Sequence, residues 1–127
     1  MNAIQLLRTM HADSKVRFKL ILGENDSARA GQQWEALQPL LKLHEDVEDQ
    51  FLYSPLQAEM PAGTLLGDWE GQHQSDVSVV QHMMQASTQL APGTPEWQMC
   101  IAQIMDALAK HITDEEGQIF PRIEQVW

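Results

Sequence analysis

The chain has 127 residues, of which 43% are hydrophobic and 20% charged, a balance typical of a folded protein rather than a disordered segment. Its formal net charge of −10 argues against binding to nucleic acids or to anionic membranes. The single cysteine, Cys100, excludes an internal disulfide and a cysteine-rich zinc site. We therefore expect one acidic domain that spans residues 1–127.

The N-terminal residues show no basic region followed by a long apolar run, so they do not resemble a secretory signal. The sequence also lacks an apolar stretch of about 18 residues that would cross a membrane. These observations predict a soluble, cytoplasmic protein. We expect a monomer or a weak homodimer.

The first two helices are predicted from periodic apolar positions. Residues 3–22 place His11 inside an apolar stripe, and residues 23–27 form a loop. A second helical pattern covers about residues 30–53. Pro39 lies inside it and predicts a kink, or alternatively a helix that begins near this proline. Ser54 and Pro55 are expected to end the second helix, and residues 60–64 form the next loop.

The third helix is predicted to start between residues 65 and 68 and to end at residue 90. His73 lies on its apolar stripe, whereas His82 is about 180° away around the helix and is expected at the surface. Thr94 is a good cap for a fourth helix, whose regular part should end at residue 117 or 121. Four such helices with short connections predict an all-α fold, an antiparallel up-down-up-down four-helix bundle.

One motif occurs twice, in the second and fourth helices. In each copy a histidine is followed four residues later by a glutamate: His44 precedes Glu48, and His111 precedes Glu115. Four residues advance a helix by about 400°, so the imidazole and the carboxylate lie on one face. Two such pairs that face each other would present nitrogen and carboxylate ligands to one buried point, as a metal site does.

The candidate ligands include one histidine from each helix and the two glutamates: His11, His44, His73, His111, Glu48 and Glu115. Each histidine alone could be a core residue hydrogen-bonded to a neighbour. Six together favour a metal, because an unsatisfied buried polar group costs about 1–3 kcal/mol. Imidazoles and carboxylates without thiolates suit iron, manganese or zinc. The neighbouring acids are expected to be solvated, although one or two could orient a ligand imidazole: Glu45, Asp46, Asp49, Asp114 and Glu116.

Tyr53 follows Glu48 by five residues. In a regular helix this spacing corresponds to about 140°, so the phenol is expected to point away from the metals and to pack near the helix end. In the alternative, residues 54–55 unwind the helix and turn the phenol towards the metal site. The other copy of the motif has Phe120 at this position, which cannot bind a metal.

This ordered set of four histidines and two glutamates resembles the cation-binding (HHE) domain of the hemerythrin family over essentially the whole chain. The resemblance implies a four-helix bundle with two iron ions joined by an oxo or hydroxo bridge. It also implies that the four histidines are terminal ligands and that Glu48 and Glu115 bridge both ions.

The sequence departs from the oxygen-carrying hemerythrins at two positions. Val77 stands where they have a fifth histidine, and Glu115 follows the last histidine by four residues where they place an aspartate after five. The chain is therefore more similar to the bacterial-type branch, which includes oxygen binders, sensors and proteins that react with peroxide or nitric oxide. Counting ligands around two six-coordinate ions leaves roughly two positions open, which predicts rapid oxidation of the reduced protein.

Three functions follow as hypotheses. The protein could bind O2 for sensing, storage or delivery, or it could turn over peroxide or NO as an oxidoreductase. A metal-free or mononuclear bundle could instead serve as an interaction module. The sequence favours a di-iron protein that reacts with O2, peroxide or NO. Beyond the metal ligands, Tyr53 is the one candidate for a catalytic residue.

Overall fold

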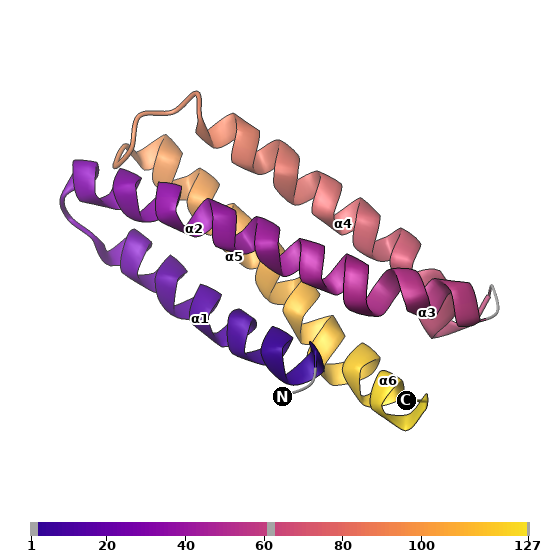
Figure 1. Ribbon diagram of the computed structural model, residues 1–127. Coiled ribbons are helices and arrows are strands. Elements are labelled where there is room, and N and C mark those ends of the chain that lie inside the picture. Colours follow the sequence, from indigo (N-terminus) through magenta and orange to yellow (C-terminus); the bar gives the residue numbers. More distant parts are fainter. Residues whose placement is uncertain (1–2, 61–62, 127) are drawn as a thin grey trace.

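The computed structural model of the protein describes residues 3–60 and 63–126. Four long helices dominate this part of the chain: α1 (Ala3–Gly23), α2 (Ser27–Glu48), α4 (Leu65–Ser87) and α5 (Pro95–Asp114). Successive helices run in opposite directions, and α1 packs against α2 and α5, whereas α4 packs against α5 (Figure 1). No strand occurs in the described residues, so the predicted all-α four-helix bundle is confirmed.

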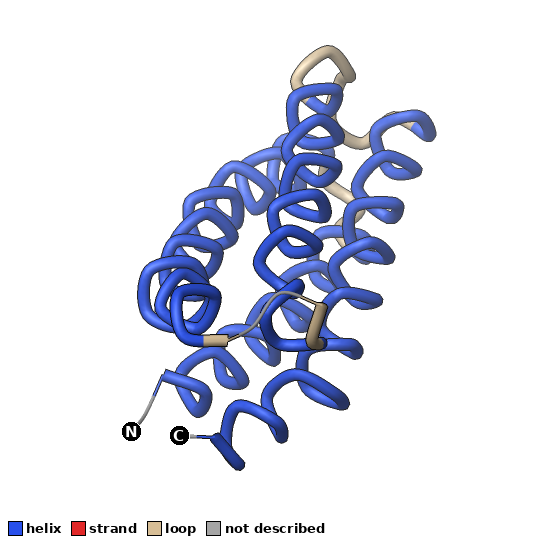
Figure 2. Tube along the Cα trace, turned by 90° about the vertical axis from the view of Figure 1, so that its right-hand side faces the viewer, coloured by secondary structure: helices blue, strands red, loops and turns tan. Residues whose placement is uncertain are grey.

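Side-chain caps fix the starts of three helices. Asp26 accepts a hydrogen bond from the backbone N–H of Arg29 at the start of α2, and Thr64 caps α4. Thr94 caps α5 as predicted. The connections gather at the two ends of the bundle (Figure 2), and residues 61–62 of one predicted loop lie outside the described residues. None of the described helices has the length and hydrophobicity that a membrane span requires.

Helix α2 begins at Ser27 and continues past Pro39, so the alternative start near this proline is wrong. Ser54 and Pro55 do not end the helical path either. A π-helical turn, η1 (Asp49–Tyr53), follows α2 and leads directly into α3 (Ser54–Glu59). Pro55 lies in the first turn of α3, where a helix tolerates a missing backbone N–H.

The regular part of the fourth helix ends at Asp114, before the predicted residues 117 and 121. The helical path nevertheless continues through a second π-helical turn, η2 (Glu115–Ile119), into α6 (Phe120–Val126). Each π-helical turn therefore lies at the glutamate of one repeated motif. A π-helical turn contains one more residue than an α-helical turn, so it changes which side chains face the interior.

Two clusters of buried apolar side chains fill the bundle on either side of a polar layer. The terminal cluster lies near both chain ends and contains Ile4, Leu7, Leu52, Tyr53, Leu56, Trp69, Ile119, Phe120 and Ile123. The main cluster contains Phe18, Ile21, Ala30, Trp34, Leu37, Leu41, Val80, Trp97, Ile101 and Ile104. On α1, for example, His11 separates Leu7 of the terminal cluster from Phe18 of the main cluster.

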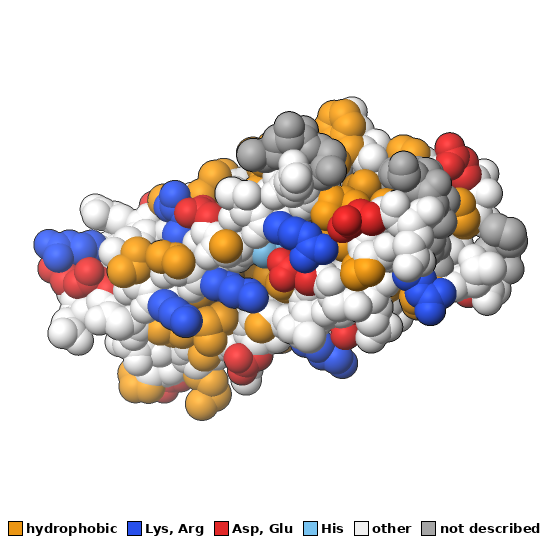
Figure 3. All heavy atoms as spheres, turned by 90° about the horizontal axis from the view of Figure 1, so that it is seen from below, with side chains coloured by type: hydrophobic (Ala, Val, Ile, Leu, Met, Phe, Trp, Pro, Cys, Tyr) orange, Lys and Arg blue, Asp and Glu red, His pale blue; other side chains and the backbone are white. Residues whose placement is uncertain are grey.

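The outer surface carries acidic and basic side chains interspersed with apolar ones. On the face shown in Figure 3, histidine is visible only as a small patch near the centre. This view agrees with the low exposure of four of the five histidines, the exception being His82. The imidazoles therefore belong to the interior of the bundle, where an unpartnered polar group is costly.

Candidate metal centre

The polar layer between the two apolar clusters consists of the six side chains singled out from the sequence. Helix α1 contributes one of them, α2 two, α4 one, and α5 with η2 the remaining two. The exposed fraction of each residue is 8% or less: His11, His44, Glu48, His73, His111 and Glu115. Helical periodicity thus predicted which polar residues meet in the interior.

These six residues form two overlapping groups. One group contains His11 and His44 together with Glu48 and Glu115. The other contains the same two glutamates together with His73 and His111. Within each group, one possible ligand atom per residue lies within 4.8 Å of all the others. The geometry therefore offers two adjacent points, each facing two imidazoles, with both carboxylates shared between them.

Hydrogen bonds alone do not satisfy these atoms. Nε2 of His11 lies 2.8 Å from Nε2 of His44, and the latter nitrogen also contacts the carboxylate of Glu48. Oε1 of Glu115 lies 3.1 Å from Nε2 of His111, which is ion-pair distance, yet it forms no hydrogen bond with any residue that the structure describes. A neutral imidazole has one N–H group to donate and a carboxylate has none. The inward-facing nitrogen and oxygen atoms therefore include several acceptor lone pairs that have no donor. A divalent cation would satisfy such a set of donors, and the residues fit one.

The charges of the two glutamates control protonation of the histidines. Burial opposes a charged imidazole, but the adjacent carboxylates of Glu115 and Glu48 raise the pKa of His11 to about 9 and that of His111 to about 11. Burial lowers the pKa of His73. Although burial opposes ionisation of Glu48 as well, the neighbouring imidazoles of His11, His111 and His44 hold the pKa of this carboxyl well below its usual range. A cation would replace these protons, because metal ligands must be deprotonated.

Two further carboxylates contact the outer nitrogens of the imidazoles. Nδ1 of His111 lies 3.0 Å from Oδ2 of Asp76, and Nδ1 of His11 lies 3.1 Å from Oε1 of Glu116. Since a carboxylate only accepts, each contact places the ring proton on Nδ1 and leaves Nε2 free to bind a cation. Glu116 was among the acids considered for this role, but Asp76 was missed. Asp76 follows His73 by three residues, and residues with this spacing lie on the same face of a helix, so the spacing was the available signal.

Aromatic rings fix the positions of the same two imidazoles. The indole of Trp69 stacks on His111 with 5.6 Å between ring centroids, and Phe120 stacks on His11 with a separation of 5.9 Å. Both aromatic residues belong to the terminal cluster. One end of the polar layer is therefore closed by ring contacts that limit rotation of the imidazoles.

The expectation that Tyr53 points away from the site is wrong. Its hydroxyl donates a hydrogen bond to Oε2 of Glu115, and the residue is buried. The cause is η1: hydrogen bonds in a π-helix join residues five apart, so a residue five positions after Glu48 returns to nearly the same face. Burial, together with the charges of Glu115 and Glu48, raises the pKa of the phenol above its usual range and keeps it protonated.

His82 lies on the outer face of α4, as its phase predicted. The residue is exposed, and its Nδ1 lies 2.8 Å from the backbone oxygen of Ser78. It is the natural control for experiments on the buried histidines.

Comparison with known proteins agrees with this arrangement. The model of the hemerythrin HHE cation-binding domain matches residues 2–123 of the chain. Neither the search of curated proteins nor the search of solved structures gave a significant match. The family match covers all four helices and all six residues of the polar layer. The chain therefore belongs to the hemerythrin HHE cation-binding domain family.

Proposed function

We propose that this protein is a non-haem di-iron protein that binds and reacts with O2 or a related small oxidant, peroxide or NO. The observation that carries the proposal is the pair of buried groups that share Glu48 and Glu115. Each group combines two imidazoles with carboxylate oxygens and contains no thiolate, a donor set that suits iron. The preference for iron over zinc or manganese follows from the family.

In this proposal His11 and His44 would hold one ion, His73 and His111 would hold the other, and the two glutamates would contact both. Bound iron would supply the electrons for reduction of an oxidant. The polar layer lies between two apolar clusters, which restrict access of water from the two ends of the bundle.

Three other residues have defined tasks. Asp76 and Glu116 would keep the inner nitrogens of His111 and His11 available by holding the ring protons on the outer nitrogens. Tyr53 would hold one oxygen of Glu115 by a hydrogen bond from its phenol, which burial keeps protonated. These tasks require no movement of the helices, because the contacts already exist.

The second candidate is reversible O2 binding, sensing or iron storage without turnover. We favour reactivity because Val77 of α4, which cannot bind a metal, lines the cavity beside His73 and His111. This position carries the fifth histidine in the oxygen-carrying hemerythrins, so one more coordination position stays open here. An O2 adduct that lasts for hours and is reversed under vacuum would favour the carrier; rapid oxidation of the reduced protein would favour reactivity.

Metal analysis combined with a visible spectrum tests the proposal directly. We expect protein from iron-fed cells to contain two irons per chain and to show near-ultraviolet bands of a bridged ferric pair. Glu48→Ala and Glu115→Ala should each lose iron and stability, since metal binding is coupled to folding, whereas His82→Ala should lose neither. Colourless protein that cannot be reconstituted with iron would overturn the proposal and leave the interaction module.

A further inference from the structure

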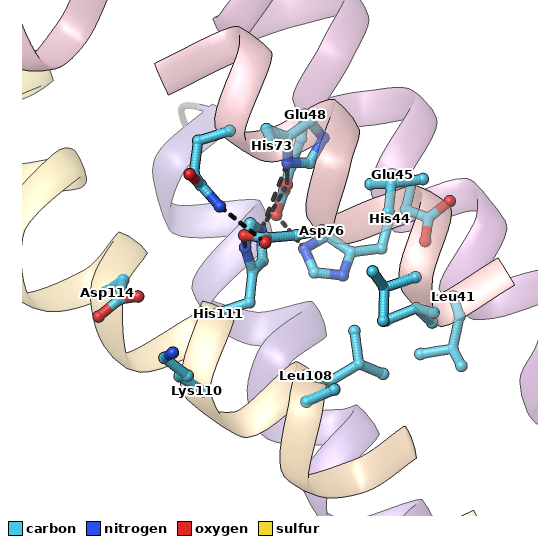
Figure 4. Close-up of a pocket in the computed structure, with 15 residues that line it drawn as sticks. Leu41, His44, Glu45, Glu48, His73, Asp76, Leu108, Lys110, His111 and Asp114 are labelled. Atoms are coloured by element: carbon cyan, nitrogen blue, oxygen red, sulfur yellow. Dashed lines mark hydrogen bonds and ion pairs between the residues drawn. The ribbon is translucent and has the colours of Figure 1, made fainter. Parts of the chain in front are cut away.

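A cavity of about 390 Å³ extends from the polar layer towards the surface between α2, α4 and α5 (Figure 4). His44, Glu48, His73 and His111 form its floor, whereas His11 and Glu115 do not line it. Most of the lining residues lie outside the polar layer, so the cavity is more than the space for metal ions. It reaches the centre mainly from the side of His73 and His111.

The cavity is much larger than a diatomic molecule needs. A water molecule takes about 30 Å³ in the liquid, so the space corresponds to roughly a dozen molecules of that size. Sites for organic ligands typically measure about 300–1,000 Å³ and combine an apolar wall with a few polar groups. The volume of this cavity falls in that range. O2, peroxide and NO therefore do not account for it.

The wall of the cavity is apolar. Leu41 of α2, Val77 and Val80 of α4, and Leu108 of α5 surround the space next to the histidines. Figure 4 shows Leu41 and Leu108 on one side of the site and the imidazoles of His44 and His111 beside them. An apolar molecule would exchange contact with water for contact with these side chains, which is favourable in proportion to the area buried.

The edge of the cavity carries an excess of negative charge. Three half-buried acidic side chains line it, those of Glu45, Asp76 and Asp114, against the single exposed ammonium group of Lys110. Burial raises the pKa of Glu45 to about 7, so Glu45 carries only part of a negative charge at neutral pH and the excess comes mainly from the two aspartates. The chain as a whole carries a formal net charge of −10. In the metal-free protein an anionic ligand would be repelled by both the edge and the whole protein, whereas an uncharged ligand would not. Cations bound in the polar layer would add an attraction for anions, so this selectivity belongs to the metal-free protein.

We propose that this cavity binds an uncharged organic molecule with an apolar body and holds it beside the His73–His111 side of the centre. The inference rests on the proposed function in so far as the bound molecule lies next to the oxidant. Binding itself requires only the cavity. It can therefore be measured independently of any reaction.

The test compares 1-hexanol with hexanoate, two probes that share a chain length and differ in charge. Binding to the metal-free protein at neutral pH, with the absence of bound iron verified by metal analysis, is followed by titration calorimetry and saturation-transfer NMR, because a carboxylate could otherwise bind iron directly. We expect hexanol to bind and hexanoate to bind at least about tenfold more weakly.

Substitutions locate the bound probe. Val77→Phe fills the inner cavity and should weaken hexanol binding by about tenfold or more. Val79→Phe provides a second test at a position that tolerates a larger side chain, because Val79 lines the cavity and is 51% exposed. Val16→Phe is the matched control, since Val16 is 57% exposed on α1 and does not line the cavity; it should leave binding unchanged.

Failure of this inference is separable from failure of the proposed function. Iron-loaded protein that reacts with an oxidant but binds no hexanol overturns the inference alone. Equal binding of both probes, or binding that neither Val77→Phe nor Val79→Phe weakens, also overturns it. Hexanol binding to a protein that cannot hold iron supports the cavity as an organic site and overturns the di-iron proposal.

Discussion

Replacing Tyr53 by phenylalanine isolates one hydrogen bond of the candidate centre. The side chain is 1% exposed and packs in the terminal cluster, so the substitution retains the ring and its apolar contacts. It removes the hydroxyl that donates to Oε2 of Glu115. The other oxygen of Glu115 lies at ion-pair distance from His111 and His11 but makes no hydrogen bond within the described residues, so the phenol is the hydrogen-bond donor that this carboxylate loses.

The size of the effect follows from the charge of the acceptor. A hydrogen bond to a charged group contributes about 1.5–3 kcal/mol, more than a bond between neutral groups. We expect the free energy of unfolding of the metal-free Tyr53→Phe variant to fall by about that amount. For a chain of 127 residues, this corresponds to a decrease in Tm of about 5–15 °C.

Thermal and chemical denaturation of the metal-free protein, followed by circular dichroism, measures this loss. The control is a double-mutant cycle with Glu115→Gln, in which Tyr53→Phe should cost less because the charged acceptor is gone. Unchanged or increased stability of the single variant would refute the assigned hydrogen bond. In iron-loaded protein, a phenolate-to-iron band that vanishes in Tyr53→Phe would show that the phenol binds iron instead of donating to Glu115.

Three other perturbations have defined outcomes. Asp76→Asn should weaken metal binding by about 10–100-fold in a metal titration because His111 loses its carboxylate partner, whereas Asp106→Asn on the exposed side of α5 should have no effect. In the metal-free protein, the pKa values of His11 and His111, about 9 and about 11, exceed their ordinary 6.5. The stability that the folded protein gains from protonated His11 and His111 is therefore complete below pH 6.5 and is lost as the pH rises through 9 to 11. Denaturation midpoints that increase over this pH interval would contradict the assignment. Val77→His should slow oxidation of the reduced protein in stopped-flow mixing with O2, and an unchanged rate would count against an open coordination position at Val77.

Helical periodicity was sufficient to predict the bundle and the convergence of the polar layer. A regular helix gives each residue a definite phase, so His73 and His82 could be assigned to opposite faces of α4. The caps of α4 and α5 are local features in which a hydroxyl oxygen accepts from a nearby backbone N–H. Such short-range chemistry can be read from a sequence.

The remaining features depend on departures from regular geometry or on distant contacts. No residue in η1 signals a π-helical turn, and the assumption of α-helical phase therefore placed Tyr53 on the wrong face. Asp76 has the sequence character of a solvated acid. Its phase places it on the same face of α4 as His73, but the contact with His111 also requires the packing of α4 against α5, which phase within one helix does not specify.

The division of the core by the polar layer has a consequence for the cooperativity of unfolding. Each apolar cluster is continuous within itself, but the groups that separate them are charged side chains whose mutual contacts depend on proton occupancy. Without a cation, we expect the end of the bundle around Leu7 and Ile119 to open separately from the end around Phe18 and Ile104. Two cations that share Glu48 and Glu115 would together engage all four helices and join the two ends into one unfolding unit. Native-state hydrogen exchange would then report a single opening free energy for the amides of both ends.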